Sequence, residues 1–151
     1  MMNRYLEQQI LTAEPVELTR LVYQAAIAAV RDARTHLREG RIAERTRAFS
    51  LAYSAITELD GSLNPEAAPE LSNRLRALYL YMEKRLVEAN TQQSDAPFAE
   101  VLSLLITLSE AWNTVAQTQR AAAHGDLTGM QPASGSSESA RSYRRNSGVS
   151  A

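Results

Sequence analysis

Residues 78–90 read LYLYMEKRLVEAN, and this stretch decides the fold because it contains no Gly or Pro and repeats its apolar residues at helical spacing. At about 100° per residue, the surrounding sequence predicts a helix over about 67–91 with one apolar stripe. Leu80 and Val87 fall on the opposite side of that helix, with Tyr79 and Tyr81 on its flanks. The helix therefore has more apolar surface than one packed face needs. The stripe itself comprises Leu71, Leu75, Leu78, Met82, Leu86 and Ala89.

Helix-breaking residues divide the chain on the N-terminal side of this stretch. Pro15 fits the first turn of a helix, and Gly40 fits the position just after a helix end. These two residues predict a helix over about 15–39. A second helix is predicted over about 41–61, because breakers follow one another in DGSLNP, residues 60–65.

The C-terminal side contains one more helix and a tail. Asp95 is a suitable N-cap and Pro97 suits the first turn, so a fourth helix is predicted from there to about 119. Residues 121–151 are mostly small and polar, which predicts a disordered tail. A short helical arm is expected near the N-terminus. Four helices with short connections predict an all-α, antiparallel up-down four-helix bundle within a domain of residues 1–120.

The apolar stripes of the other helices leave residues unaccounted for. The predicted core stripes are Leu18, Val22, Ala25, Ala26, Ala29, Val30, Ala33 and Leu37; then Ile42, Phe49, Ala52, Tyr53, Ile56 and Leu59; and finally Val101, Leu104, Leu105, Leu108, Trp112 and Val115. Outside these stripes lie Leu21, Ile27, Leu51, Leu102 and Ile106. Such residues on neighbouring helices predict an exposed apolar surface for a protein partner. Homodimerisation and ordinary surface exposure are the two alternatives.

Composition narrows the function classes. The chain has 16 basic and 17 acidic residues and a net charge of −1, so neither nucleic acid nor a membrane is expected as a partner. Cysteine is absent, and MMNRYLEQQ at the N-terminus lacks the apolar core of a secretory signal, so we expect a cytosolic protein. No catalytic motif is present, and no cofactor or enzymatic activity is expected.

His36 is a candidate site of chemistry. The sequence HLREG, residues 36–40, resembles the motif of phosphotransfer domains, in which an exposed His on a four-helix bundle is followed by a basic residue and a Gly. Here Glu39 takes the position of the basic residue, where its negative charge would repel a phosphoryl group. Neither His36 nor His124 follows a Glu by three residues, which argues against a di-iron site. A plain surface His is the expected role.

LYLYMEKRLVEAN resembles the signature of the flagellar secretion chaperone family, FliS. Other pieces agree with the family in order and spacing: Tyr5 and Ile10, then LTAEPVEL, LVYQAAI, ITELDGSLN and LSEAWNTV. The resemblance covers about residues 3–119. One departure matters here, because Leu80 stands where the family usually has Asp between the two tyrosines.

This resemblance implies a bundle that binds the C-terminal region of newly made flagellin as helices in apolar grooves. Binding would prevent premature polymerisation and keep flagellin competent for flagellar type III secretion. The flagellar export gate is a further candidate partner, and the free chain is expected to be a monomer or a weak homodimer. The arm with Tyr5 and Ile10 is implied to cover a groove until cargo displaces it.

The candidate partner-binding residues combine the implied arm with the unaccounted apolar side chains. Met82 and Leu86 have a second interpretation as pure core residues. The alternatives to the chaperone function are a phosphotransfer domain using His36 and a structural bundle that dimerises. The predicted partner-binding set is Tyr5, Ile10, Leu21, Ile27, Leu51, Tyr79, Leu80, Met82, Leu86, Val87, Leu102 and Ile106.

Overall fold

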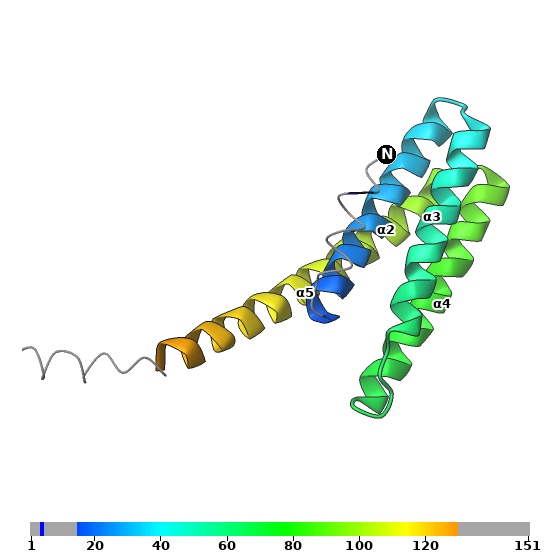
Figure 1. Ribbon diagram of the computed structural model, residues 1–151. Helices are drawn as coiled ribbons and strands as arrows, with labels where there is room; N and C mark the ends of the chain where they lie inside the picture. Colours follow the sequence, from blue (N-terminus) through cyan, green and yellow to red (C-terminus); the bar gives the residue numbers. More distant parts are fainter. Residues whose placement is uncertain (1–3, 5–14, 130–151) are drawn as a thin grey trace, which may run out of the picture. The chain divides into compact units, whose positions relative to one another are not determined.

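The computed structural model describes residue 4 and residues 15–129, apart from the side chains of residues 119, 123, 124 and 126–129. The described residues form an all-α bundle, which confirms the predicted fold class (Figure 1). Tyr5 and Ile10, and the tail from residue 130, lie outside the described residues. The long helices are α2 (Pro15–Arg38), α3 (Ile42–Gly61), α4 (Pro69–Gln92) and α5 (Asp95–Gly129).

Local signals place the helix ends. Gly40 has a φ of 71°, and the Arg41 N–H donates to the His36 carbonyl at 2.9 Å, which closes the C-terminus of α2. Pro69 is the first residue of α4. The same helix is followed by Gln93, which has a φ of 53° in the left-handed region. The turns between helices are therefore fixed by backbone geometry as well as by packing.

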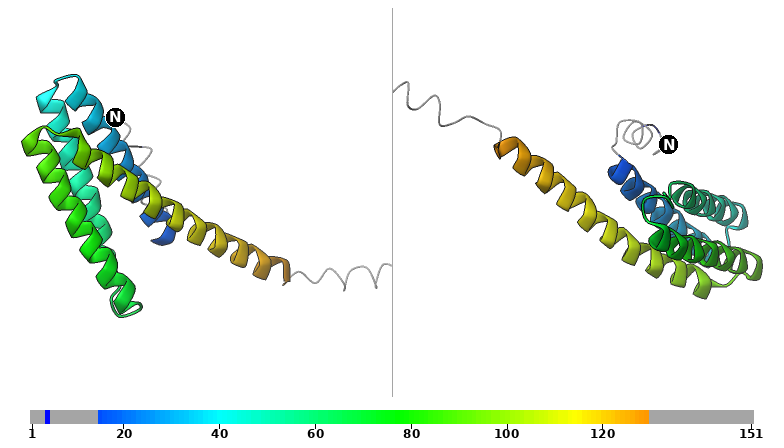
Figure 2. Two further views of the ribbon diagram at one scale, coloured as in Figure 1. Left: turned by 180° about the vertical axis from the view of Figure 1, so that it is seen from behind. Right: turned by 90° about the horizontal axis from the view of Figure 1, so that it is seen from below.

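Successive helices run antiparallel, and α3 packs beside both α2 and α4 (Figures 1 and 2). The start of α5 is joined to α2, because Arg34 donates to both carboxylate oxygens of Asp95 at 2.8 and 3.0 Å. The start of α3 is joined to the end of α4, because buried Arg45 donates to the side chain of Asn90 at 3.0 Å. The bundle is thus closed at one end by two cross-helix contacts.

The core is built from small and large side chains in alternation. Five alanines of α2 and α3 are buried, so these two helices can approach closely, while larger residues of all four helices fill the remaining space. Ser72 and Ser109 are also buried on the inner faces. The fully buried large side chains are Tyr23, Val30, Ile56, Leu59, Tyr79, Met82, Leu86, Phe98, Val101 and Leu105.

Several predicted stripe positions are wrong. Four residues predicted for the core are exposed: Ile42, Tyr53, Leu71 and Val115. Tyr79 was expected on a flank and Leu102 away from the core, yet both are buried. The buried faces of α4 and α5 are rotated relative to the predicted stripes, because small residues such as Ser72, Ser109 and Ala116 occupy buried positions. A pattern of large apolar residues does not reveal them.

The last helix is longer than predicted. We expected it to end at about residue 119, and α5 ends at Gly129. Residues 121–129 are therefore helical rather than part of a disordered tail. A boundary between two compact units falls inside α5, after Ala116, so residues 95–116 belong with α2, α3 and α4. None of the described helices has the length and apolar character needed to cross a membrane.

Candidate partner-binding site

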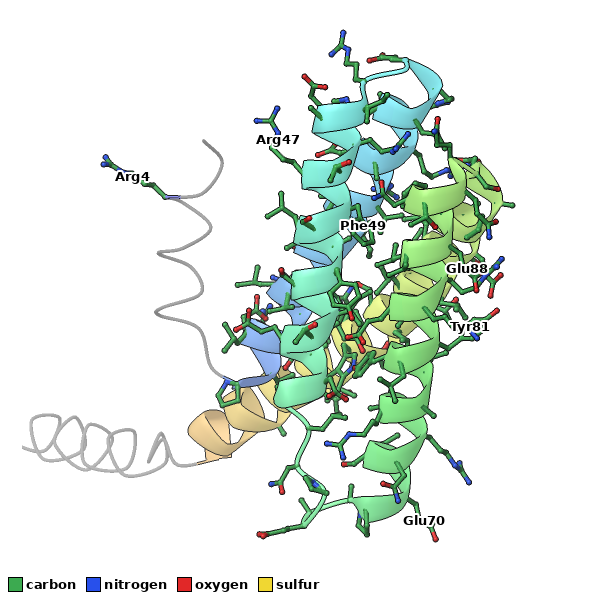
Figure 3. All side chains as sticks on the ribbon, turned by 90° about the vertical axis from the view of Figure 1, so that its right-hand side faces the viewer. Arg4, Arg47, Phe49, Glu70, Tyr81 and Glu88 are labelled. Atoms are coloured by element: carbon green, nitrogen blue, oxygen red, sulfur yellow. The ribbon has the colours of Figure 1, made fainter. Side chains whose placement is uncertain are left out.

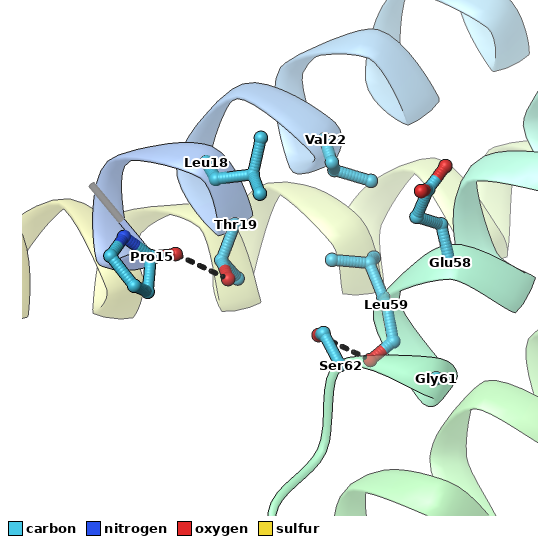
Figure 4. Close-up of a pocket in the computed structure, with 8 residues that line it drawn as sticks. All are labelled: Pro15, Leu18, Thr19, Val22, Glu58, Leu59, Gly61 and Ser62. Carbon is cyan, nitrogen blue, oxygen red and sulfur yellow. Dashed lines mark hydrogen bonds between the residues drawn. The ribbon is translucent and has the colours of Figure 1, made fainter. Parts of the chain in front are cut away.

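An apolar groove lies between the N-terminal half of α2 and the C-terminal end of α3 (Figure 4). It has a volume of about 470 Å³, and we call it the α2–α3 groove. Leu18, Val22 and Leu59 are among its apolar lining residues, while Thr19 and Ser62 direct their hydroxyls to backbone carbonyls within their own helices or turns. Its described lining comprises Pro15, Leu18, Thr19, Val22, Glu58, Leu59, Gly61 and Ser62.

A second groove lies on the other flank of α2, against α5. This α2–α5 groove has a volume of about 380 Å³. Ile27 and Ile106 form its apolar floor from opposite helices, and Arg31 and Glu110 add charge at its rim. The two grooves share α2 as a wall. The described lining of the second comprises Gln24, Ile27, Ala28, Arg31, Ile106, Ser109 and Glu110.

A third hollow, which we call the loop cavity, lies beneath the α3–α4 connection. It has a volume of about 210 Å³. Thr19 and Ser62 line both this cavity and the α2–α3 groove. Its other described lining residues come from the connection, from α4 and from α5: Leu63, Asn64, Ala67, Ala68, Leu71, Ser72, Leu75, Tyr79 and Trp112.

Three aromatic side chains form a buried polar cluster next to the loop cavity. The hydroxyls of Tyr23 and Tyr79 lie 2.5 Å apart, and the Trp112 indole N–H donates to the Tyr23 hydroxyl at 3.1 Å. Burial raises the pKa of Tyr23, and burial together with the hydrogen bond to Tyr23 raises the pKa of Tyr79. Both phenols are therefore protonated, neutral donors at physiological pH.

The two flanks of α4 differ in polarity. On the flank toward α5, Glu100 accepts hydrogen bonds from Tyr81 and Arg85, and Arg85 also pairs with Glu88 (Figure 3). The hydrogen bond from Tyr81 lowers the pKa of Glu100. Toward α3, where Thr57 donates to Glu83 at 3.2 Å, the surface carries Leu80 and Val87. Those residues are 57% and 41% exposed.

The family model described as Flagellar protein FliS matches residues 1–119 of this chain. The chain belongs to the FliS family. The Flagellar secretion chaperone FliS of Salmonella typhimurium is 31% identical over 111 residues, which cover 73% of this chain and 82% of that protein. The Flagellar secretion chaperone FliS of Bacillus subtilis is 31% identical over 121 residues, covering 80% of this chain and 90% of that protein.

A third FliS relative agrees with these two. The Flagellar secretion chaperone FliSB of Pseudomonas aeruginosa is 32% identical over 110 residues, which cover 73% of this chain and 87% of that protein. The matched lengths span most of each relative. The FliS assignment made on the motifs of the sequence is thereby confirmed.

In this FliS chain, five of the predicted partner-binding residues remain at the surface or in a groove. The structure brings Ile27 and Ile106 together in the α2–α5 groove. Leu80 and Val87 lie seven positions apart on one face of α4, and Leu51 is 67% exposed on α3. Their role in binding a partner stays a prediction.

The other described members of the predicted set are buried. Met82 and Leu86 are fully enclosed, as their interpretation as core residues requires. Tyr79 and Leu102 also belong to the core cluster, whereas Leu21 is buried outside it. His36 is half-buried in the last turn of α2, and its Nδ1 is buried without a partner among the described residues; the phosphotransfer alternative stays a hypothesis.

The sequence did not predict which residues line the α2–α3 groove and the loop cavity. Leu18, Val22 and Leu59 were predicted as core residues; Leu59 is in the core and Val22 packs against it, but all three also line the α2–α3 groove, which was not predicted. Ser72 was not singled out, although it is buried against the loop cavity. The signal was present in part, because Gly61, Asn64 and Pro65 predicted an irregular connection beside these residues.

Proposed function

We propose that this protein is a cytosolic export chaperone that binds the disordered C-terminal region of flagellin, prevents its premature polymerisation and keeps it competent for flagellar type III secretion. The observation that carries the proposal is the match of residues 1–119 to the FliS family, whose relatives are named flagellar secretion chaperones. The protein acts by binding and not by catalysis.

The surface of the bundle supports this proposal. Two grooves flank α2, with volumes of about 470 and 380 Å³, and each is bounded by two helices; the first is mainly apolar and the second is mixed in polarity. Such grooves accept an amphipathic helix, whose apolar face is read at intervals of three and four residues. A disordered segment pays an ordering cost on binding, and several grooves together offset it better than one.

The apolar face of α4 gives the same cargo a further contact. Leu80 and Val87 are exposed there although nothing in the described fold requires apolar side chains at those positions. Covering them would remove apolar area from water, at about 25 cal/mol per Å².

The direct test is calorimetric titration of the full chain with the C-terminal segment of the same organism's flagellin, with helicity followed in parallel by circular dichroism. We expect saturable one-to-one binding, a gain of helix and a negative heat-capacity change. Absence of binding at roughly tens of micromolar would contradict the proposal.

A scrambled segment of identical composition is the matched control for the cargo. It retains the charge and the average hydropathy but loses the helical spacing of apolar residues. Equal binding of both segments would show that the surface captures apolar chains without regard to pattern, which is not the proposed function.

A further inference from the structure

The loop cavity combines an apolar wall with hydroxyl groups. Leu71 and Leu75 line it from α4, and Ser72 lies between them in sequence. Its volume of about 210 Å³ is far more than one water needs and falls below the roughly 300 Å³ at which pockets for separate small molecules begin. A cavity of this size suits one side chain of a longer bound segment.

Ser72 brings an unpaired hydroxyl to this cavity. The residue is only 6% exposed, and its backbone N–H donates to the Ala68 carbonyl at 2.9 Å. Its Oγ makes no hydrogen bond within the described part of the chain but is still reached by solvent, and Ser72 lines the cavity. A group that displaces water from this hydroxyl must offer it a polar partner or leave it unpaired.

The aromatic cluster beside the cavity has three donor hydrogens but forms only two hydrogen bonds. Trp112 supplies an N–H, and Tyr23 and Tyr79 supply an O–H each, but the indole bond and the hydroxyl–hydroxyl bond use only two of these three hydrogens. The remaining phenolic hydrogen has no acceptor among the described residues. Of the two phenols only Tyr79 lines the cavity, so an acceptor placed there completes the cluster when the hydroxyls turn so that Tyr23 donates to Tyr79 and Tyr79 donates to the acceptor.

The lining also determines which side chains are unsuitable. None of its described residues is an Asp, Glu, Lys, Arg or His, so an ion in the cavity would lose its hydration without gaining a counter-charge. A purely apolar side chain would leave the hydroxyl of Ser72 and the spare phenolic hydrogen without partners. A group that is uncharged and both donates and accepts meets these needs.

We propose that the loop cavity is a recognition pocket for one carboxamide side chain, that of Gln or Asn, on the bound segment. The amide carbonyl accepts the spare phenolic hydrogen of the Tyr23–Tyr79 pair, and the amide N–H donates to Ser72 Oγ. This inference rests on the proposed function, because the segment in question is the flagellin C-terminal region. It adds a polar anchor that fixes the register of a helix held otherwise by apolar contacts.

A double-mutant cycle tests the use of the pocket by cargo. Each Gln and Asn of the flagellin segment is replaced singly by Met, and binding is measured to the full-length protein and to Ser72→Ala. One replacement should weaken binding to the unmodified protein by roughly 5- to 100-fold and have little effect on binding to Ser72→Ala. Ser50→Ala, at an exposed serine of α3, is the matched control and should preserve the full loss.

A probe of the cavity that does not depend on flagellin tests its chemistry. Trp112 is the only tryptophan, so its indole N–H gives a single resolved NMR signal. Propionamide should shift this signal saturably, propionate should not, and Ser72→Leu, which fills the cavity, should abolish the effect of propionamide.

The outcomes separate the two proposals. An unmoved signal, or an equal response to propionate, would overturn the pocket's proposed chemistry. Binding of the flagellin segment with no carboxamide position coupled to Ser72 would overturn its use by cargo. If the segment did not bind at all, the proposed function would fail, and the propionamide titration would still decide what the cavity recognises.

Discussion

Tyr23 is the residue at which the buried hydrogen bonds of the aromatic cluster meet. It accepts from Trp112 and shares a hydrogen with Tyr79. Tyr23→Phe removes both bonds and leaves two donors unpaired, so we expect a loss of about 2–4 kcal/mol in the free energy of unfolding. Tyr79→Phe removes one bond and should cost about 0.5–1.5 kcal/mol. Urea unfolding checks the order; equal losses would show that the indole bond contributes nothing.

Burial of these phenols makes stability depend on alkaline pH. The pKa of Tyr79 is raised above the ordinary 10.0, mainly by burial, and that of Tyr23 is raised as well. A raised pKa in the folded state stabilises the fold below the unfolded pKa, and this contribution is lost as pH rises above about 10. We therefore expect unfolding to accompany the ionisation of these tyrosines. Tyrosinate absorbance measured together with circular dichroism checks this.

The matched comparison uses one buried and one exposed phenol. Tyr79→Phe should make the fall in stability above about pH 10 less steep, because one coupled ionisation is removed. Tyr53→Phe, on an exposed ring of α3, should leave the slope unchanged. If Tyr23 and Tyr79 ionised reversibly with no change in helicity, their hydroxyls would have to be accessible to water, which would contradict this prediction.

At the scale of the helices, the end of α4 contains a strained residue. Gln93 has a φ of 53°, a conformation that costs a non-glycine residue about 1 kcal/mol or more. Gln93→Gly should therefore raise the free energy of unfolding by up to about 1 kcal/mol. Gln92→Gly, one residue earlier and inside the helix, should lower it by about 1 kcal/mol. Urea unfolding of the two variants measures both effects. Changes of the same sign would show that the positive φ of Gln93 does not strain the end of α4.

Helix boundaries were largely predictable because they depend on local chemistry. Pro15 and Gly40 define α2 to within one residue of the prediction, since proline fixes φ and glycine accepts the positive φ of the turn. The end of α5 was not predicted. Its extension contains AAA at residues 121–123, and the strong helix propensity of alanine outweighs the polar composition of the segment.

The rotation of each helix was less predictable, because it depends on distant partners. Tyr79 is buried since its hydroxyl meets Tyr23, which lies 56 residues earlier in the chain. Leu71 has the more apolar side chain and is exposed, because it lies at the start of α4 beside the connection from α3. The face of α4 that contains Tyr79 and the face that contains Leu71 both have helical spacing of apolar residues, so no local pattern shows which of them is buried.

For the whole molecule, the strongest test is the removal of the apolar face of α4. Leu80→Asp combined with Val87→Asp should leave helicity unchanged, because both residues are exposed. It should weaken binding of the flagellin segment by at least roughly 100-fold if both are binding hot spots. Circular dichroism measures the helicity, and calorimetry measures the binding of the flagellin segment. Collapse of the fold would show that these side chains belong to the core.

Ile42→Asp is the matched control for this double change. Ile42 is 60% exposed at the start of α3, away from the three hollows described above. The same kind of substitution there should alter binding little. Comparable losses at both sites would mean that charge, rather than the position of the apolar face, governs the association.

The sequence predicted which helices carry apolar residues outside their core stripes, but it did not predict the shape of the grooves. Ile27 and Ile106 were identified as surplus, and the fold places them in one groove. The α2–α3 groove was not identified, because Leu18 and Val22 have the same spacing as core residues. Whether a stripe is covered by another helix or left open depends on helix crossing angles, which sequence periodicity does not specify.

The position of α2 between two grooves has a kinetic consequence. A cargo chain that occupies both must cross this helix, and each groove then holds the chain at a high local concentration for the other. Spontaneous escape requires both contacts to open together and is slow. A receptor that peels the chain from one groove at a time needs to overcome only one contact per step, so long retention and rapid hand-over are compatible in the same complex.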